Sequence, residues 1–415
     1  MRFIHTADIH LGKTYRGSPG EAQRYDDFFS CLETIVADSV REAVDFVLIC
    51  GDLFHTGQIL PRTLARTIET LQPLKDAAIP CIAVEGNHDW IHRRDSISWM
   101  EALSEMGYIT LLRPERTSDG GYAFPLFDAD TGRGGRIEID GLTIYGVGYI
   151  GAQAGSHVHR ICDGVATDHN LLLFHVGVWQ YSPVEIGNMR IEEALPLAGT
   201  FDYVALGHGH KPYTIATPDG VPFAFNPGAP ERVNFGEQEY DKGYYLVTRE
   251  NGRFEVLFRP TDPRPMAVLR VDLDGCGTAD EAMDRFRDAV RAQTASLSSS
   301  RAPLLELKLT GRVGFHPFEL ARERLRVALD EVCAPLHLEV RNHLSRVTRA
   351  GGETLVKKSL ADIEREVLVE LLSAHSLGRD REEELADLAL AIRDLALRDK
   401  VDDEELLGLL DGREI

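Results

Sequence analysis

One pattern recurs through residues 1–260. A short run of apolar, β-prone residues ends abruptly in Asp, His or Asn, in most cases beside a glycine. The pattern occurs at residues 3–10, 46–52, 81–89, 171–175 and 203–210. Near-continuous apolar runs of this length are typical of strands that are buried on both faces of a sheet. We therefore predict five buried strands, each followed at once by polar side chains.

Helical stretches separate several of these strands. Residues 27–43 and 62–78 carry apolar positions at helical spacing between successive apolar runs. Alternation of strands and helices favours an α/β domain in which helices cover the sheet. We expect this layered α/β domain to span residues 1–260.

A different pattern follows the Pro-rich stretch at 259–265, which we interpret as a domain boundary. Strands and helices are expected to alternate here, at 267–273, 279–292, 304–309, 316–332 and 336–340. This order predicts a small α+β cap domain over residues 266–345. Two amphipathic helices are then expected at 359–372 and 382–397, within a helical tail that covers residues 355–415.

Composition narrows the class of protein. With 43% hydrophobic and 27% charged residues, the chain has an ordinary globular composition. It shows no apolar run of membrane-spanning length and no secretory signal, and its six cysteines are scattered, so a cytoplasmic protein without a membrane partner is expected. The net charge of −21 opposes bulk attraction to nucleic acid. Bound divalent cations would reverse that charge locally.

The strand ends carry the candidate chemistry. Ligands of open α/β sheets gather outside the carboxyl ends of the strands. All five predicted strands end in side chains that can bind a metal: Asp8, His10, Asp52, Asn87, His175, His208 and His210. A mixture of imidazole, carboxylate and amide ligands without thiolate suits manganese, iron or zinc better than magnesium or calcium.

These motifs, in this order, resemble those of the calcineurin-like metallophosphoesterase superfamily: Asp-x-His, Gly-Asp, Gly-Asn-His-Asp, His and Gly-His-x-His. Within it, residues 3–12, 51–55 and 207–212 look most like SbcD-type repair nucleases. The resemblance covers residues 1–240 with specific motifs and later segments only in layout. It implies a core of two layered sheets and two divalent metal ions, with Mn²⁺ as the expected metal.

Carried over position by position, the resemblance also implies two ligand sets that share Asp52. The first metal would be held by Asp8, His10, Asp52 and His210. The second would be held by Asp52, Asn87, His175 and His208. In such a site two divalent ions bind a phosphodiester and lower the pKa of the attacking water.

Three neighbouring residues have further expected roles. His88 adjoins a ligand but is not needed to complete either set, so we assign it to proton transfer at the leaving oxygen, with Asp89 orienting its ring. The alternative is that His88 merely packs against the site. His55 is expected either to contact substrate phosphate or to begin a helix without a catalytic role.

The resemblance implies a DNA exonuclease and endonuclease of double-strand-break repair, acting with an SMC-like ABC ATPase of the SbcC type. Two other classes remain open. One is another enzyme of the superfamily, such as a protein phosphatase or a cyclic-nucleotide phosphodiesterase. The other is a non-catalytic DNA-tethering scaffold, which predicts a damaged ligand set, whereas every ligand position is filled here.

Two sets of apolar stripes raise the question of partners. Stripes at 64–71 and 97–106 occupy a region through which SbcD-type nucleases pair, which implies a homodimer within a heterotetramer, but ordinary core packing gives the same periodicity. In the tail, the stripes contain Leu360, Ile363, Val367 and Leu371, then Leu385, Leu388, Ala389, Ile392 and Leu395. These helices either pack within the chain or, as the resemblance implies, bind the ATPase.

Overall fold

The computed structural model describes residues 1–91, 95–182, 186–294, 301–347, 360–374 and 381–396. The chain divides into two compact units, residues 1–347 and residues 348–415, and each unit is described by itself. None of the described helices is long and apolar enough to cross a membrane.

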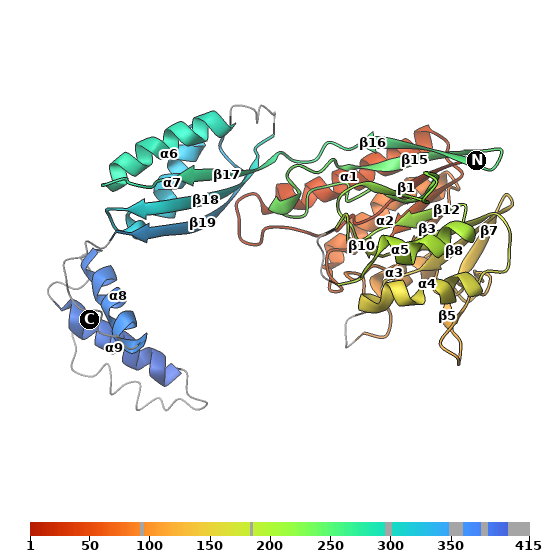
Figure 1. The fold of residues 1–415 in the computed structure, drawn as a ribbon, viewed down its shortest axis with the longest axis horizontal. Coiled ribbons are helices and arrows are strands. Elements are labelled where there is room, and N and C mark those ends of the chain that lie inside the picture. Colours follow the sequence, from red (N-terminus) through yellow and green to blue (C-terminus); the bar gives the residue numbers. More distant parts are fainter. Residues whose placement is uncertain (92–94, 183–185, 295–300, 348–359, 375–380, 397–415) are drawn as a thin grey trace. The chain divides into compact units, whose positions relative to one another are not determined.

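The first sheet of the larger unit has the strand order β16-β15-β1-β2-β3-β4. Figure 1 labels β16, β15, β1 and β3 of this sheet. Strands β1 to β4 run parallel, and the hairpin β15–β16 joins β1 in antiparallel pairing. The bounds are β1 Arg2–Thr6, β2 Phe46–Cys50, β3 Cys81–Val84, β4 Thr110–Leu111, β15 Gly243–Glu250 and β16 Arg253–Pro260. Three of the five predicted strands thus lie side by side in this sheet.

The second sheet has the order β13-β14-β12-β9-β8-β7 and contains the other two predicted strands, β9 and β12. Strands β8, β9, β12 and β14 are parallel, and β7 and β13 are antiparallel edge strands. The bounds are β7 Arg136–Ile139, β8 Leu142–Val147, β9 Asn170–Phe174, β12 Tyr203–Leu206, β13 Tyr213–Ala216 and β14 Pro222–Asn226. Two short pairs lie outside both sheets: β5 Glu115–Arg116 with β6 Tyr122–Ala123, and β10 Gly177–Val178 with β11 Asn188–Met189.

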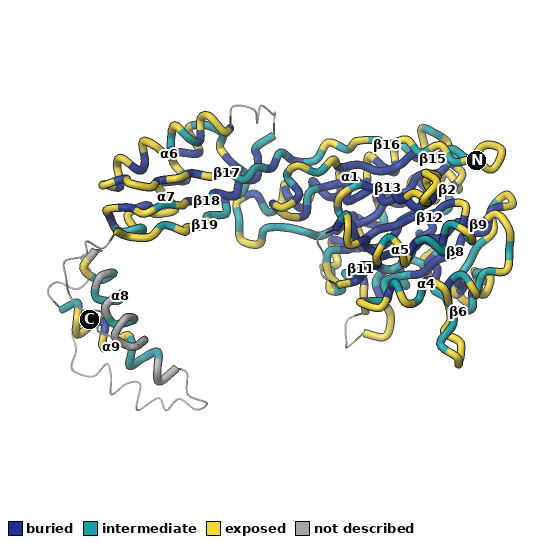
Figure 2. The backbone as a smooth tube through the Cα atoms, viewed as in Figure 1, coloured by how far each residue is buried: buried dark blue, intermediate teal, exposed yellow. Residues whose placement is uncertain are grey.

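The two sheets pack face to face, which explains why their strands are apolar on both sides. Phe3 and Leu48 of the first sheet share one core with Leu173 and Tyr203 of the second, and the rings of Phe3 and Tyr203 meet edge to face at 5.5 Å. Figure 2 shows the strands of both sheets largely in the buried colour.

Helices cover the two outer faces of the sheets. Their bounds are α1 Glu21–Arg41, α2 Pro61–Asp76, α3 Trp99–Glu105, α4 Ala154–Asp163 and α5 Ile191–Ala194. Residues of α1, α2 and α3 share a buried cluster with the first sheet, and residues of α4 and α5 share one with the second. The predicted layered, two-sheet α/β core is therefore confirmed.

The apolar stripes on α2 and α3 belong mainly to this core. Leu71, Met100 and Leu103 are buried against the first sheet, and Leu64 and Ile68 are partly buried in the same cluster. Core packing accounts for these residues. Leu60, Ile97 and Met106 remain exposed nearby.

The cap segment, residues 266–346, forms a three-stranded parallel sheet with two helices. Its elements are β17 Met266–Asp272, α6 Ala279–Thr294, β18 Leu304–Val313, α7 Arg322–Asp330 and β19 His337–Arg346. The helix expected over 316–332 is instead a short 3-10 turn, Pro317–Glu319, followed by α7. The interruption falls at buried Leu320, whose ψ of 61° lies outside the helical region.

A buried ionic network joins the cap segment to the core, and we call it the junction network: Arg24, Asp27, Glu231 and Arg264. The Arg264 guanidinium binds both carboxylate oxygens of Asp27, at 2.5 and 2.7 Å. Arg24 lies 3.2 Å from Asp27 and 3.2 Å from Glu231, and Glu231 accepts the Arg264 backbone N–H at 2.9 Å. These contacts fix the chain just before β17 against α1.

The smaller unit contains α8 Leu360–Ala374 and α9 Glu382–Ala396, which pack against each other. Arg365 pairs with Asp387, and Arg393 pairs with Glu364. Ala386 and Leu388 are buried, whereas Val367 is exposed. Ser359, the first residue of the helix expected over 359–372, lies outside the described residues, as do the side chains of Leu360, Ile363 and Leu395.

Candidate metal centre

The ends of five parallel strands bring all seven ligand candidates together. In the first sheet β1, β2 and β3 end at one edge, and in the second sheet β9 and β12 do so. We call the resulting group the metal edge: Asp8, His10, Asp52, Asn87, His175, His208 and His210. Ligand-type atoms of Asp8, His10 and His210 lie within 4.8 Å of one another, and so do those of Asp52, His175 and His208.

The backbone at the metal edge is unusual. Asp8, His10, Asp52 and His208 have φ angles of 53°, 53°, 51° and 74°, in the left-handed region that residues other than glycine rarely adopt. Asp8 and His10 both follow the end of β1, so this turn conformation, and not the pleat of the strand, directs their side chains. Such strain concentrates at functional sites.

Two glycines make room for the ligands. A Cβ atom on Gly51, whose φ is 84°, would lie 2.1 Å from Nδ1 of His175. A Cβ atom on Gly86 would lie 2.0 Å from Oδ1 of Asp52. The missing side chain of Gly51 thus makes room for the ring of His175.

Hydrogen bonds fix the protonation of two histidine rings. Nδ1 of His175 lies 2.7 Å from the Cys50 carbonyl, and Nε2 of His208 lies 2.8 Å from the Ile186 carbonyl. Because a carbonyl oxygen only accepts, each of these nitrogens carries the proton and the other ring nitrogen presents a lone pair. Those lone-pair nitrogens lie 3.3 and 2.9 Å from Oδ1 of Asn87. Three electron-pair donors therefore converge, as a cation requires.

The other ligand set converges in the same way. Nδ1 of His210 donates to the Glu237 carboxylate at 2.8 Å, so its Nε2 is free of a proton when the ring is neutral. That Nε2 lies 3.1 Å from Nε2 of His10. Burial, reinforced by the neighbouring histidines, lowers the pKa of His10, so this ring is neutral near pH 7.

Two carboxylates complete the arrangement. Oδ2 of Asp52 lies 3.8 Å from His10 Nε2 and 3.6 Å from His175 Nε2, which places it between the two sets. Oδ2 of Asp8 is buried and has no hydrogen-bond partner within the described structure. Burial raises the pKa of Asp8 to about 6 although His210 and His175 oppose the shift. A cation would satisfy this orphaned oxygen, so these residues fit two divalent metals.

His88 and His55 lie beside the first set. The two rings stack at 5.4 Å, and the ring of His88 meets that of His10 edge on at 4.8 Å. Nδ1 of His88 donates to the His55 carbonyl at 2.7 Å, which leaves Nε2 of His88 for proton transfer. The backbone N–H of His88 donates to Oδ1 of Asp52 at 2.8 Å. His55 lies between β2 and α2, not at a helix start.

The expected role of Asp89 needs correction. Its carboxylate accepts backbone N–H groups of Leu53, Phe54 and Gly86 at 3.3, 2.9 and 2.9 Å, and the ring of His88 is held by the His55 carbonyl instead. Asp89 is 2% exposed, and burial, followed by the nearby Asp52 charge, raises its pKa to about 7. Asp89 therefore shapes the loops that carry Asp52 and Asn87.

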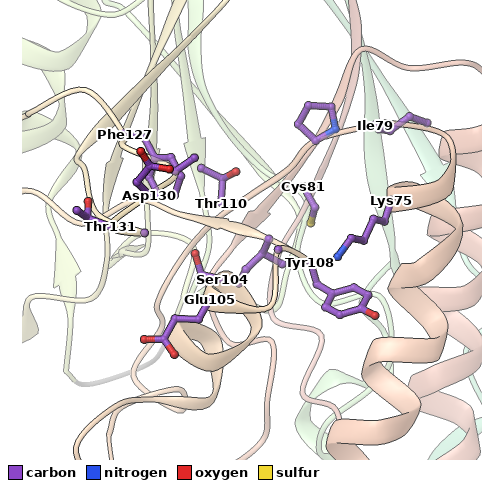
Figure 3. A pocket seen from close by; sticks show the side chains of 15 residues that line it. Lys75, Ile79, Cys81, Ser104, Glu105, Tyr108, Thr110, Phe127, Asp130 and Thr131 are labelled. Carbon is purple, nitrogen blue, oxygen red and sulfur yellow. The ribbon is translucent and has the colours of Figure 1, made fainter.

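A separate cavity of about 560 Å³ lies beside β3 and β4 and includes none of the metal-edge residues (Figure 3). Its lysine, Lys75, already donates to the Met106 carbonyl at 3.0 Å and lies over the ring of Tyr108 at 4.4 Å. The lysine of this cavity is therefore already satisfied, in contrast to the orphaned Asp8 oxygen at the metal edge.

Comparison with known proteins gives an independent view of the chain. The family model described as calcineurin-like phosphoesterase matches residues 1–212, which include the whole metal edge. The chain is 30% identical over 291 residues to the DNA double-strand break repair protein Mre11 of Haloferax volcanii, covering 70% of this chain and 58% of that protein.

Two further relatives bear the same description. The protein of Halobacterium salinarum is 32% identical over 249 residues, covering 60% of this chain and 56% of the relative. That of Methanopyrus kandleri is 26% identical over 404 residues, covering 94% of this chain and 85% of the relative. The chain thus spans little more than half the length of the two haloarchaeal relatives. The match over residues 1–212, together with the site it contains, shows that this chain belongs to the calcineurin-like phosphoesterase family.

Proposed function

We propose that this chain is a metal-dependent nuclease that hydrolyses DNA phosphodiester bonds in double-strand-break repair, with two manganese ions as cofactors. The observation that carries the proposal is the convergence of two sets of electron-pair donors on either side of Asp52. Imidazole, carboxylate and amide donors without thiolate are a ligand set that suits Mn²⁺.

When bound, two divalent cations supply positive charge at the phosphate and an activated water. The chain's own residues do the rest. Asp52 spans both ligand sets, and its hydrogen bond from the His88 backbone fixes the position of His88. In its doubly protonated form the His88 ring keeps the Nδ1 proton on the His55 carbonyl and delivers the Nε2 proton to the leaving oxygen. Burial lowers the pKa of His55 to about 3, so this ring stays neutral and contacts substrate as a hydrogen-bonding group without charge.

Two observations favour DNA over a small phosphoester. The relatives are described as DNA double-strand break repair proteins, and the match to the Methanopyrus kandleri protein extends over 94% of this chain, beyond the phosphoesterase region. The cap segment is held to the core by buried ion pairs, and it adds a surface that a small substrate does not need.

A substrate comparison tests the proposal. The full chain with Mn²⁺ is offered linear duplex DNA, single-stranded DNA and a mononucleotide monoester, with Asp52→Asn as the inactive control. We expect cleavage of DNA by the wild type alone. Cleavage restricted to the monoester would identify another phosphoesterase instead.

We further propose that the chain forms a homodimer and binds an SMC-like ABC ATPase of the SbcC type through residues 355–415. Exposed Leu60, Ile97 and Met106 are available for dimer contacts. In the tail, α8 and α9 pack on each other but leave Val367 exposed, and the acidic side chains of α9 favour a basic partner surface.

Truncation separates the partner role from catalysis. Deletion of residues 355–415 should abolish co-elution with the ATPase and ATP-dependent cleavage, while Mn²⁺-dependent cleavage of single-stranded DNA persists. If the truncated chain still co-elutes with the ATPase on gel filtration, the docking site lies elsewhere. Light scattering of the full chain at micromolar concentration should give the mass of a dimer.

A further inference from the structure

Behind the metal edge, four donors converge on one buried carboxylate. Glu237 ends a short 3-10 turn, Phe235–Glu237, and is 3% exposed. Its Oε1 accepts from His210 Nδ1 at 2.8 Å and from the Asn234 side chain at 2.7 Å. Its Oε2 accepts from Lys242 Nζ at 2.5 Å and from the Val233 backbone at 3.1 Å. The carboxylate is therefore immobilised from both sides.

Lys242 reaches the same ligand by a second route. Its buried ammonium group also donates to the backbone carbonyl of His210, at 3.1 Å. Glu237 and Lys242 thus hold both the ring and the main chain of His210. No sequence motif marks either residue, because they lie 27 and 32 residues beyond His210.

The partner of His210 differs from those of the other fixed histidines. His175 and His208 donate to backbone carbonyls, whereas His210 donates to a carboxylate. A carboxylate partner fixes the tautomer more firmly and makes the metal-facing nitrogen more basic.

We propose that Glu237, clamped by Lys242, is a positioning residue that holds His210 in the tautomer needed for one metal and strengthens the binding of that metal alone. The inference rests on the proposed two-metal function. It extends that function by assigning different supports to the two ligand sets. No contact in the described structure joins Glu237 to Asn87, His175 or His208, so the second set should not depend on it.

Metal titration tests the proposal without any measurement of activity. Mn²⁺ binding to the full chain is followed by electron paramagnetic resonance for the wild type, Glu237→Ala and Glu237→Gln. The wild type should bind two ions. In Glu237→Ala one ion should bind about 10–100-fold more weakly, the usual effect of losing such a partner, and the other should be unchanged. Glu237→Gln keeps an acceptor for His210, so its loss of Mn²⁺ affinity should be smaller than that of Glu237→Ala.

Histidine NMR supplies a readout in the metal-free protein. At a pH where the ring is neutral, the wild-type His210 signal, assigned by its absence in His210→Gln, should show the proton on Nδ1. Glu237→Ala should give a mixture of tautomers, because the fixed acceptor is gone. Glu239→Gln, on an exposed neighbour in the same segment, is the matched control and should change neither the tautomer nor either affinity.

The outcomes are distinguishable. If the wild type binds no Mn²⁺, the proposed function fails. If the wild type binds two ions and Glu237→Ala binds both with unchanged affinity, the positioning role is wrong. Equal weakening of both ions would also overturn it and indicate a general structural role. Should Glu237→Ala not fold, Glu237→Gln decides: selective weakening of one ion supports the proposal, and two unchanged or equally weakened ions reject it.

Discussion

The metal edge and the junction network both bury charged side chains, but they satisfy those charges in opposite ways. In the junction network every carboxylate oxygen of Asp27 and Glu231 accepts a hydrogen bond from a neighbour. At the metal edge Oδ2 of Asp8 has no partner, and the lone-pair nitrogens of His175 and His208 face another acceptor, Oδ1 of Asn87. Leaving a buried polar group unpaired costs about 1–3 kcal/mol. A site that leaves a buried carboxylate oxygen and neighbouring lone pairs unpaired is therefore organised for a ligand, whereas a network in which every carboxylate oxygen is paired serves architecture.

The largest expected effect is at Asp52, the residue between the two ligand sets. Asp52→Asn keeps the shape and the acceptor for the His88 backbone, so the fold should persist, but it removes the shared charge. Loss of both ions should lower DNA cleavage by about 10⁴-fold or more, since each metal contributes several kcal/mol. Mn²⁺ titration and cleavage rates measure both effects. Two ions bound at wild-type affinity would show that Asp52 is not the shared ligand.

His88→Asn should separate chemistry from metal binding. His88 is assigned to proton transfer and not to ligation, so cleavage should fall by about 10²–10⁴-fold while two Mn²⁺ ions remain bound. The backbone hydrogen bond to Asp52 survives the substitution, which isolates the role of the ring. The parallel measurement of turnover and Mn²⁺ stoichiometry decides the matter. Near-normal turnover would mean that the ring only packs against the site.

The contrast between the two regions also explains which features the sequence could predict. The metal-edge residues lie in short motifs at the ends of apolar runs. Parallel pairing brings the ends of these strands to one edge of the sheet, whatever the conformation of the segments that connect them. The junction network joins Arg24 and Asp27, which are one helical turn apart, to Glu231 and Arg264, and no local pattern connects the helix to these two distant positions. Asp89 was assigned wrongly because its neighbour in sequence, His88, points to a different partner. Helical periodicity on α2 and α3 showed that one face is apolar but not that the first sheet covers it.

The junction network should respond to mutation in stability and not in metal binding. Asp27→Ala leaves Arg24 and Arg264 buried with one carboxylate between them, and removing one partner of a buried pair costs about 3–5 kcal/mol. The neighbouring exposed pair gives the control: Asp26→Ala loses a contact to Arg66 and should cost about 1 kcal/mol or less. Urea unfolding gives the free energy of unfolding of each variant, and a separate Mn²⁺ titration of the folded protein gives its metal affinity. Weakened metal binding in folded Asp27→Ala would show that the two regions are coupled.

The smallest effect expected is a difference in the pH dependence of the two metals. In the metal-free protein burial raises the pKa of Asp8 to about 6, and the pKa of His210 is also raised, so acidification through pH 6 protonates two ligands of the first set. In the second set burial lowers the pKa of His208 to about 4, so that ring stays neutral over the same range. A metal must displace each proton that its ligands hold, which weakens binding by about tenfold per pH unit for each proton. The first ion should therefore lose affinity on acidification from pH 7.5 to 5.5, while the affinity of the second changes much less.

Mn²⁺ titrations at pH 7.5, 6.5 and 5.5 measure, for each ion, the slope of the logarithm of its affinity against pH. The side chain introduced by Asp8→Asn holds no proton that the metal must displace. In this variant the slope for the first ion, which equals the number of protons displaced on binding, should therefore fall by about one. Parallel slopes for both ions in the wild type would mean that the protonation of Asp8 and His210 does not distinguish the sets.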